Sequence, residues 1–470
     1  MGETWATLGV DLHLETGGDA AHGGVRKGLT DALREAVRGG RLAPGTRLPS
    51  SRSLAVDLGI ARNTVADAYA DLVAEGWLTA RQGSGTRVAE RVITPPVRPA
   101  PTRRPVGAPT YDLSPGTPDL SSFPRAEWLK AARRAMAKAP NDALGYGDPR
   151  GRVELREALA GYLARARGVR ADPDRIVVTA GFVHGLSLMG AVLRRRGLRE
   201  VTVESYGLDV HWNLLHRAGL RTAPLDFDEL GTSTAGLGSG AGSSKAVLLT
   251  PAHQFPMGVP LHPDRRAAAV DWARREGGLI LEDDYDGEFR YDRQPVGALQ
   301  GLDPECVVYL GTASKSLAPG LRLGWMVVPS GVRDEVLGEK DAAALSCGTL
   351  DQLTLAEFLT SGAYDRHVRG ARLRYRRRRD QLVEALAARS PEVRATGIAA
   401  GLHAVLELPP GTEQSIVQAA NWERLAVQGL SRFRHPRATV RQRDALVVGY
   451  GTPAEHGWAG ALEALCRVLP

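Results

Sequence analysis

One lysine stands in a loop of small and hydroxyl-bearing residues, GTASKSLAPGLRLGW at 311–325. Lys315 is flanked by Ser, Ala and Leu, and desolvation in such surroundings favours the neutral amine. A neutral amine can attack an aldehyde and form a Schiff base. The hydroxyls of Thr312 and Ser314 and the forked guanidinium of Arg322 suit a dianionic phosphate. This combination predicts a pyridoxal phosphate (PLP) site, and the alternative is an ordinary turn with a surface lysine.

A second polar stretch, EDDYDGEFRY at 282–291, follows a short apolar run. A carboxylate at a strand end can pair with the ring nitrogen of PLP and keep it protonated, and we assign this role to Asp283. We expect Tyr285 to hydrogen-bond the phenolic oxygen of the ring. An acidic surface turn or a metal site would be the alternatives. Metal ligands would need a convergent set of His or carboxylate groups, and since none is obvious we predict no metal.

A glycine after the apolar run Ile176–Val178 marks the start of a helix. The first N–H groups of a helix have no partner within it, and the positive end of the helix dipole attracts anions. We therefore expect Gly181, Phe182 and Val183 to complete the phosphate site.

These residues require a sheet whose strands end at one edge. From about residue 113 the chain alternates apolar runs with helical periodicity, which is typical of a mainly parallel sheet covered on both faces. Ligands bind beyond the carboxyl ends of such strands. Within a domain over 113–470, we expect a large α/β lobe over about 150–350 and a smaller α+β lobe over about 351–470. The expected strands are Ile176–Val178, Val201–Val203, Ala246–Thr250, Leu279–Asp283 and Cys306–Leu310.

The first 88 residues have a different pattern, with a compact core over 25–88. Helical spacing over Val25–Gly40 is followed by a Pro/Gly turn, a second short helix, and a third helix starting near Arg62. A two-stranded ribbon with a glycine-rich tip comes next. This order predicts a winged helix-turn-helix, an α domain with a small β wing that binds double-stranded DNA, although a three-helix interaction module is the alternative.

The residues expected to contact DNA form three groups. The first turn of the third helix would meet base edges or phosphates, the start of the second helix would meet the phosphate backbone, and the wing tip would approach the minor groove. In that order they are Arg62, Asn63 and Thr64; Arg47, Ser50, Ser51 and Arg52; and Gln82 and Gly83.

The rest of the chain sets broader limits. Residues 89–112 hold six prolines and read as a semi-rigid linker. A net charge of +7 favours an anionic partner, and the basic run 372–379 is either a solvated helix face or a second DNA contact. Three scattered cysteines form no disulfide framework. Without an apolar run long enough for a membrane or a signal peptide, we expect a cytoplasmic protein.

These segments together resemble the MocR/GabR-like regulators, in which a GntR-type winged helix is fused to a fold-type I aminotransferase-like domain. LAPGTRLPSSRSLAVDLGIARNTVADAYADLVAEGWLTARQGSGT is similar to the GntR winged helix, and TPAHQFPMG, EDDYDGEFRY and SKSLAPGLRLGW are similar to aminotransferase motifs. The resemblance implies a head-to-tail homodimer with PLP bound to Lys315 as a Schiff base. It also implies that Tyr146, in GYGDPRG, reaches the phosphate of the partner protomer.

The chain departs from this family where PLP and its ligands would be contacted. Leu208, in Glu-Ser-Tyr-Gly-Leu, stands where the family has the aromatic residue that stacks on PLP, and Tyr206 could take that role by a local shift. Val210 replaces an arginine that binds the ligand carboxylate in some members. The arginine that holds a substrate carboxylate in aminotransferases is absent near 446–449, unless Arg441 or Arg443 supplies it.

An amino acid needs a carboxylate clamp to dock productively. The sequence therefore predicts a PLP-dependent transcription regulator whose effector is PLP or its adduct with an amine or amino acid. The alternative is an active aminotransferase that carries a DNA-binding appendage.

Overall fold

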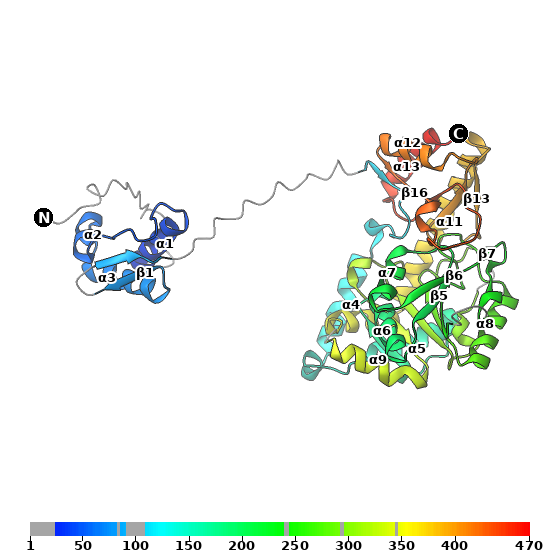
Figure 1. Ribbon diagram of the computed structural model, residues 1–470, viewed down its shortest axis with the longest axis horizontal. Coiled ribbons are helices and arrows are strands. Elements are labelled where there is room, and N and C mark those ends of the chain that lie inside the picture. The colour runs from blue at the N-terminus through cyan, green and yellow to red at the C-terminus, as the bar shows by residue number, and fades with distance from the viewer. Residues whose placement is uncertain (1–23, 82–84, 91–108, 239–243, 292–295, 344–345) are drawn as a thin grey trace. The chain divides into compact units, whose positions relative to one another are not determined.

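The computed structural model describes residues 24–81, 85–90, 109–238, 244–291, 296–343 and 346–470 of the chain. Two compact units, Met1–Val106 and Gly107–Pro470, make up the molecule (Figure 1). Gln82, Gly83 and most of the predicted linker lie outside the described residues. Across those ranges no helix combines the length and apolar character needed to cross a membrane.

The first unit contains the predicted three helices and hairpin. They are α1 (Gly24–Arg38), α2 (Ser51–Leu58), α3 (Arg62–Ala74), β1 (Leu78–Arg81) and β2 (Gly85–Val88). Ser50 caps α2 because its hydroxyl accepts a hydrogen bond from the Ser53 N–H at 3.1 Å. Gly59 ends the helix in the left-handed region at φ 64°. One apolar core, with Leu33, Leu54 and Leu72 among its members, joins the three helices to the hairpin.

A seven-stranded sheet forms the centre of the second unit, with the order β4-β12-β11-β10-β9-β5-β6. Its strands are parallel except β12, which runs antiparallel to β4 and β11. The prediction of a mainly parallel sheet is confirmed, although the sequence did not reveal β6 or β12. The bounds are β4 (Ile176–Thr179), β5 (Glu200–Glu204), β6 (Arg221–Leu225), β9 (Ala246–Leu249), β10 (Leu279–Asp284), β11 (Val307–Thr312) and β12 (Gly324–Val327).

Successive side chains of these strands pack on opposite faces of the sheet, because a strand alternates with period two. Ile176 and Val178 join one apolar cluster, whereas Val177 joins another. Helices cover both faces. On the Ile176 face lie α4 (Arg125–Lys138), α5 (Val153–Arg167), α8 (Pro263–Glu276) and α10 (Thr349–Thr360), and on the Val177 face lie α6 (Phe182–Arg195), α7 (Asp209–Arg217) and α9 (Ser330–Ala342).

A smaller α+β lobe is built on an antiparallel sheet with the order β13-β14-β17-β16. Its strands are β13 (Arg394–Thr396), β14 (Ala404–Glu407), β16 (Gln428–Gly429) and β17 (Ala445–Val448), and its helices are α11 (Ala363–Arg389), α12 (Glu413–Trp422) and α13 (Trp458–Val468). At the start of the second unit, β3 (Tyr111–Asp112) pairs with β15 (Leu425–Ala426) of this lobe. A short hairpin, β7 (Phe227–Asp228) and β8 (Gly231–Thr232), lies beside the large sheet.

Candidate functional site

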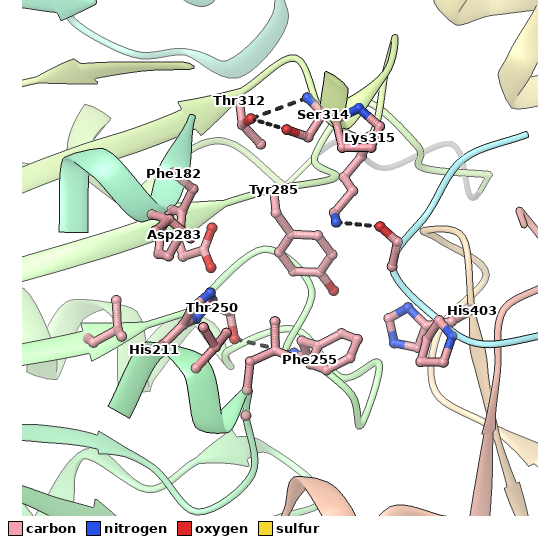
Figure 2. A pocket seen from close by; sticks show the side chains of 18 of the residues that line it. Phe182, His211, Thr250, Phe255, Asp283, Tyr285, Thr312, Ser314, Lys315 and His403 are labelled. Atoms are coloured by element: carbon pink, nitrogen blue, oxygen red, sulfur yellow. Dashed lines mark hydrogen bonds between the residues drawn. The ribbon is translucent and has the colours of Figure 1, made fainter. Parts of the chain in front are cut away.

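A cavity of about 380 Å³ lies at the carboxyl ends of the large sheet's strands, which is where ligands of α/β sheets bind. Most of the residues predicted to bind PLP line it. They are Phe182, Val183, Tyr206, Asp283, Tyr285, Thr312, Ser314, Lys315 and Arg322. Figure 2 shows Lys315, Tyr285 and Asp283 pointing into this space from neighbouring strand ends.

Three consecutive acids at the end of β10 have three different surroundings. Glu282 accepts hydrogen bonds from the N–H groups of residues 299 and 300, at 2.6 and 2.8 Å. Asp284 forms a buried ion pair with Arg167, with Nε to Oδ2 at 2.7 Å. Asp283 lies on the opposite side of the strand and lines the cavity, and its buried Oδ1 has no hydrogen-bond partner among the described residues. Burial, followed by the nearby Asp284, raises the pKa of Asp283 well above its usual value.

Lys315 follows the end of β11, the strand next to β10. Burial lowers the pKa of its amine, while the carboxylates of Asp283 and Asp286 act in the opposite direction. The Nζ atom donates a hydrogen bond to the carbonyl oxygen of Gly116. Nothing in the sequence connects these two residues, which are 199 positions apart.

The residues predicted to bind the phosphate of PLP lie close to one another at one end of the cavity. The Thr312 and Ser314 hydroxyl oxygens are 2.9 Å apart. Gly181, with φ 85°, precedes α6, and no side chain caps that helix. A Cβ at Gly181 would lie 3.7 Å from Nη1 of Arg322, so the guanidinium lies against the bare backbone at the helix start. These groups bring hydroxyls, a guanidinium and an uncapped helix start together, and such groups can donate hydrogen bonds to an anion.

Tyr285 lies beside a buried network that the sequence did not reveal. Its hydroxyl donates to the carbonyl of His253 at 3.0 Å, and Nδ1 of His253 is 2.8 Å from Oδ2 of Asp286. His403 completes a set of three potential metal ligands whose ligand atoms lie within 4.8 Å of one another. Nε2 of His403, however, donates to the carbonyl of Pro256 at 3.0 Å. The network therefore supports one wall of the cavity by hydrogen bonds within the protein.

The two tyrosines assigned from the family resemblance have different settings. Tyr206 lines the cavity, but its side chain belongs to an apolar cluster with Phe255 and Phe433. Tyr146 is fully exposed on the surface of the second unit. An exposed tyrosine is available for contact with another subunit.

The candidate clamp residues for a ligand carboxylate lie away from the cavity. Arg441 is exposed. Nη1 of Arg443 lies 3.6 Å from Oε1 of Glu407, and these two side chains are 45% and 29% exposed, respectively. Leu208 and Val210 line the cavity instead. Among the described residues of the cavity wall, Arg322 is the only arginine.

In the first unit, the predicted base-contacting residues lie at the start of α3. Arg62 and Asn63 are exposed and Thr64 is half-buried. Arg47 and Arg52 are also exposed. The Ser50 hydroxyl oxygen accepts the capping hydrogen bond of α2 and retains its own proton for donation to another acceptor.

Several residues of the cavity wall were not predicted from the sequence. Besides Gly116, they include Glu204, His211, Trp212 and Leu402. Glu204 stands in the Glu-Ser-Tyr-Gly-Leu segment, but residue type and spacing assigned it no role. Gly116 and Leu402 reach the cavity from segments distant in the sequence.

Comparisons with known proteins agree with this division of the chain. Residues 26–88 match the bacterial regulatory proteins of the gntR family, and residues 110–443 match aminotransferase class I and II. The HTH-type pyridoxine biosynthesis transcriptional regulator PdxR of Corynebacterium glutamicum is 35% identical over 381 residues, which are 80% of this chain and 82% of that protein. The probable rhizopine catabolism regulatory protein MocR of Rhizobium meliloti is 32% identical over 383 residues, 76% of each protein.

The second unit is also similar to solved enzymes. An archaeal alanine:glyoxylate aminotransferase superposes with a TM-score of 0.69 at 24% identity, covering 76% of this chain and 90% of the enzyme. This likeness establishes the aminotransferase fold.

Proposed function

This chain belongs to the MocR-like transcription regulators, which join a GntR-type DNA-binding domain to an aminotransferase-like domain, and from that premise we propose that PLP is its effector. PLP is the cofactor that the aminotransferase fold implies. In this proposal, PLP occupancy of the second unit changes the affinity of the first unit for DNA. Because the DNA of a bacterium is in its cytoplasm, the protein would act there.

The residues of the cavity fit this cofactor. When bound, PLP supplies an aldehyde that reacts with amines and a ring that withdraws electrons. Asp283 offers a buried carboxylate oxygen without a partner to the ring nitrogen, and Lys315 offers an amine whose lowered pKa favours the neutral form. Arg322 and the uncapped start of α6 would hold the phosphate. Tyr285 would orient the PLP ring by a hydrogen bond to the phenolic oxygen of that ring.

The missing carboxylate clamp is the observation that favours PLP over an amino acid as effector. The cofactor side of the cavity retains its lysine, aspartate and arginine. The side that would present an amino acid has Leu208 and Val210, and no second arginine lines the cavity in the described ranges. A carboxylate buried beside these side chains would lose its hydration without gaining a charged partner.

The strap of residues 114–117 offers a route from the cavity toward the DNA-binding unit. Its Gly116 carbonyl accepts the hydrogen bond from Lys315, and Thr452 holds its two ends through the carbonyls of Ser114 and Thr117 at 2.7 and 3.0 Å. An amine used to hold PLP has fewer protons to donate, so the strap would lose part of this bond. The strap closely follows the predicted linker 89–112 in the chain, and a change in its position would alter where that linker ends.

This route produces regulation only if PLP binds two arrangements of the protein unequally. We further propose a homodimer, because a PLP site of this kind would use Tyr146 of the partner protomer. Exposed apolar residues on α4 and just before Tyr146 in the chain support this proposal, since Leu129, Met136 and Leu144 are 65%, 51% and 60% exposed.

A DNA titration tests the proposed function. Fluorescent duplexes selected from a random-sequence pool would be titrated at one stated salt concentration, with and without PLP. PLP should change the dissociation constant of the wild-type protein by about fivefold or more, the usual lower range of allosteric coupling. An unchanged constant would rule out PLP as effector.

Two variants complete the experiment. Lys315→Ala should lose both the absorbance band of bound PLP and the response of DNA binding to PLP. Lys245→Ala is the matched control, because Lys245 forms an exposed ion pair with Glu276 at 2.9 Å on the same unit. Sustained amino-group transfer from an amino acid to a keto acid would instead favour an enzyme.

A further inference from the structure

The wall of the cavity lacks the aromatic residue expected to face the cofactor ring, since Leu208 stands at that position. We propose that His211 provides this flat surface and holds the ring by face-to-face contact. The inference rests on the proposed PLP site and adds a residue that neither the motifs nor the comparisons indicated.

The two other aromatic residues of segment 206–212 are held elsewhere. The Tyr206 side chain is 3% exposed and packs edge-on against Phe227, with ring centroids 6.2 Å apart. Trp212 packs edge-on against His435 with centroids 4.7 Å apart. Gly207 lies so close to the Trp212 indole that an added Cβ would be 3.3 Å from it. Turning either ring into the cavity would leave a void in a packed cluster.

His211 has the position that this role requires. It lies in the first turn of α7, directly after the segment where the expected aromatic residue would be, and it lines the cavity. Its ring contacts the ring of Phe182 with centroids 4.7 Å apart and an interplanar angle of 44°. Figure 2 shows His211, Phe182 and Asp283 on one side of the cavity and His403 on the other. The imidazole therefore belongs to the same wall as the carboxylate proposed to meet the ring nitrogen.

The protonation state of His211 suits contact with an aromatic ring. Burial, helped by the positive charge of Lys315, lowers its pKa to about 3. The imidazole is therefore neutral over any ordinary assay range. A cationic imidazole would repel a protonated ring nitrogen, whereas a neutral ring offers a polarizable face.

Three substitutions of His211 distinguish a role that needs a flat ring from a role that needs only the volume of the side chain. His211→Leu occupies a similar volume without a flat ring, His211→Ala removes the ring and the volume, and His211→Phe restores an aromatic face. Affinity for PLP would be measured by quenching of tryptophan fluorescence, and the orientation of the bound ring by circular dichroism in the cofactor absorbance band.

We expect His211→Leu and His211→Ala to bind PLP about three- to tenfold more weakly, the range that aromatic pairing supports. Their cofactor circular dichroism should also change in shape. His211→Phe should bind within about twofold of wild type and restore the signal. His216→Ala is the control, because His216 lies on the same helix with its ring 3.0 Å from Thr222 Oγ1, outside the cavity.

Two results would overturn the inference alone. One is wild-type affinity and circular dichroism in His211→Leu, and the other is loss of both in Tyr206→Leu while the His211 variants remain normal. If the wild-type protein did not bind PLP, the proposed function would fail together with this inference. The cofactor-free proteins should have similar thermal unfolding, which separates a direct contact from a general loss of structure.

Discussion

Replacing Asp284 with Asn should destabilise the protein far more than replacing its neighbour Asp283 with Asn. Both carboxylates are buried at the end of β10, with 5% and 6% of their surfaces exposed, respectively. They differ in what surrounds them. Asp284 contacts Arg167 and the Tyr309 hydroxyl, whereas Asp283 lines the cavity with one oxygen atom unsatisfied among the described residues.

The cost at Asp284 follows from the charge that would remain. Its two oxygens accept hydrogen bonds from Nε and Nη2 of Arg167 at 2.7 and 3.0 Å, and the two side chains are 1% and 3% exposed. Burial tends to lower the pKa of Arg167, but the Asp284 charge more than offsets this effect and the pKa is raised. Removing one partner of such a buried pair costs about 3–5 kcal/mol, because the other charge stays desolvated and unpaired.

The expected cost at Asp283 is within about 1 kcal/mol, because the amide has nearly the same shape as the carboxyl and no ion pair is broken. Binding should show the opposite order. Asp283→Asn removes the charge proposed to meet the ring nitrogen, and a hydrogen bond to a charged group is worth about 1.5–3 kcal/mol, or roughly ten- to a hundredfold in PLP affinity.

Both variants would be unfolded by denaturant without PLP, following tryptophan emission, and then titrated with PLP under native conditions. The free energy of unfolding should fall only in Asp284→Asn, and the PLP affinity should fall mainly in Asp283→Asn. Equal destabilisation by the two substitutions would refute the distinction between a structural and a cofactor-facing carboxylate.

Three further outcomes are expected. Arg62→Ala should weaken DNA binding by about 1–3 kcal/mol and relax base preference while the absorbance band of bound PLP persists. The control Arg199→Ala, on the second unit, should leave DNA binding unchanged. Burial raises the pKa of Glu204 to about 7. The stability contributed by the protonated Glu204 carboxyl is therefore complete below the pKa of about 4.5 in the unfolded chain, and it is lost as the pH rises to about 7. In urea unfolding across this pH range, the free energy of unfolding of the wild type should fall by on the order of 3 kcal/mol relative to that of Glu204→Gln. A difference between the two proteins that did not change with pH would contradict the raised pKa. Gly311→Ala should cost about 1–3 kcal/mol in the same assay, because the new Cβ would lie 2.2 Å from Trp325 Nε1.

The sequence predicted the elements whose signals are local. Helical spacing, a Pro/Gly turn and a glycine-rich ribbon identified the first unit, and strands β10 and β11 were recognised from continuous apolar runs. By contrast, β12, which begins at the end of the lysine-containing stretch 311–325, was not recognised from the sequence. Its four residues, Gly324–Val327, become a strand because they fit between β4 and β11. Short strands are stabilised by pairing with distant neighbours, which a single sequence does not display.

The same distinction applies to the site. The sequence by itself determined that an acid-rich turn follows β10 and that Lys315 follows β11, because residue type and spacing along each strand suffice for that. The sequence also assigned the role of pairing with the ring nitrogen to Asp283, but only the tertiary structure shows why Asp284 does not face the cavity, since Arg167, 117 positions away, forms an ion pair with it. It likewise brought Gly116 to Lys315 and placed His211 in the wall. Strand alternation separates neighbouring side chains into two sets, but the packing of distant helices decides which set meets the ligand.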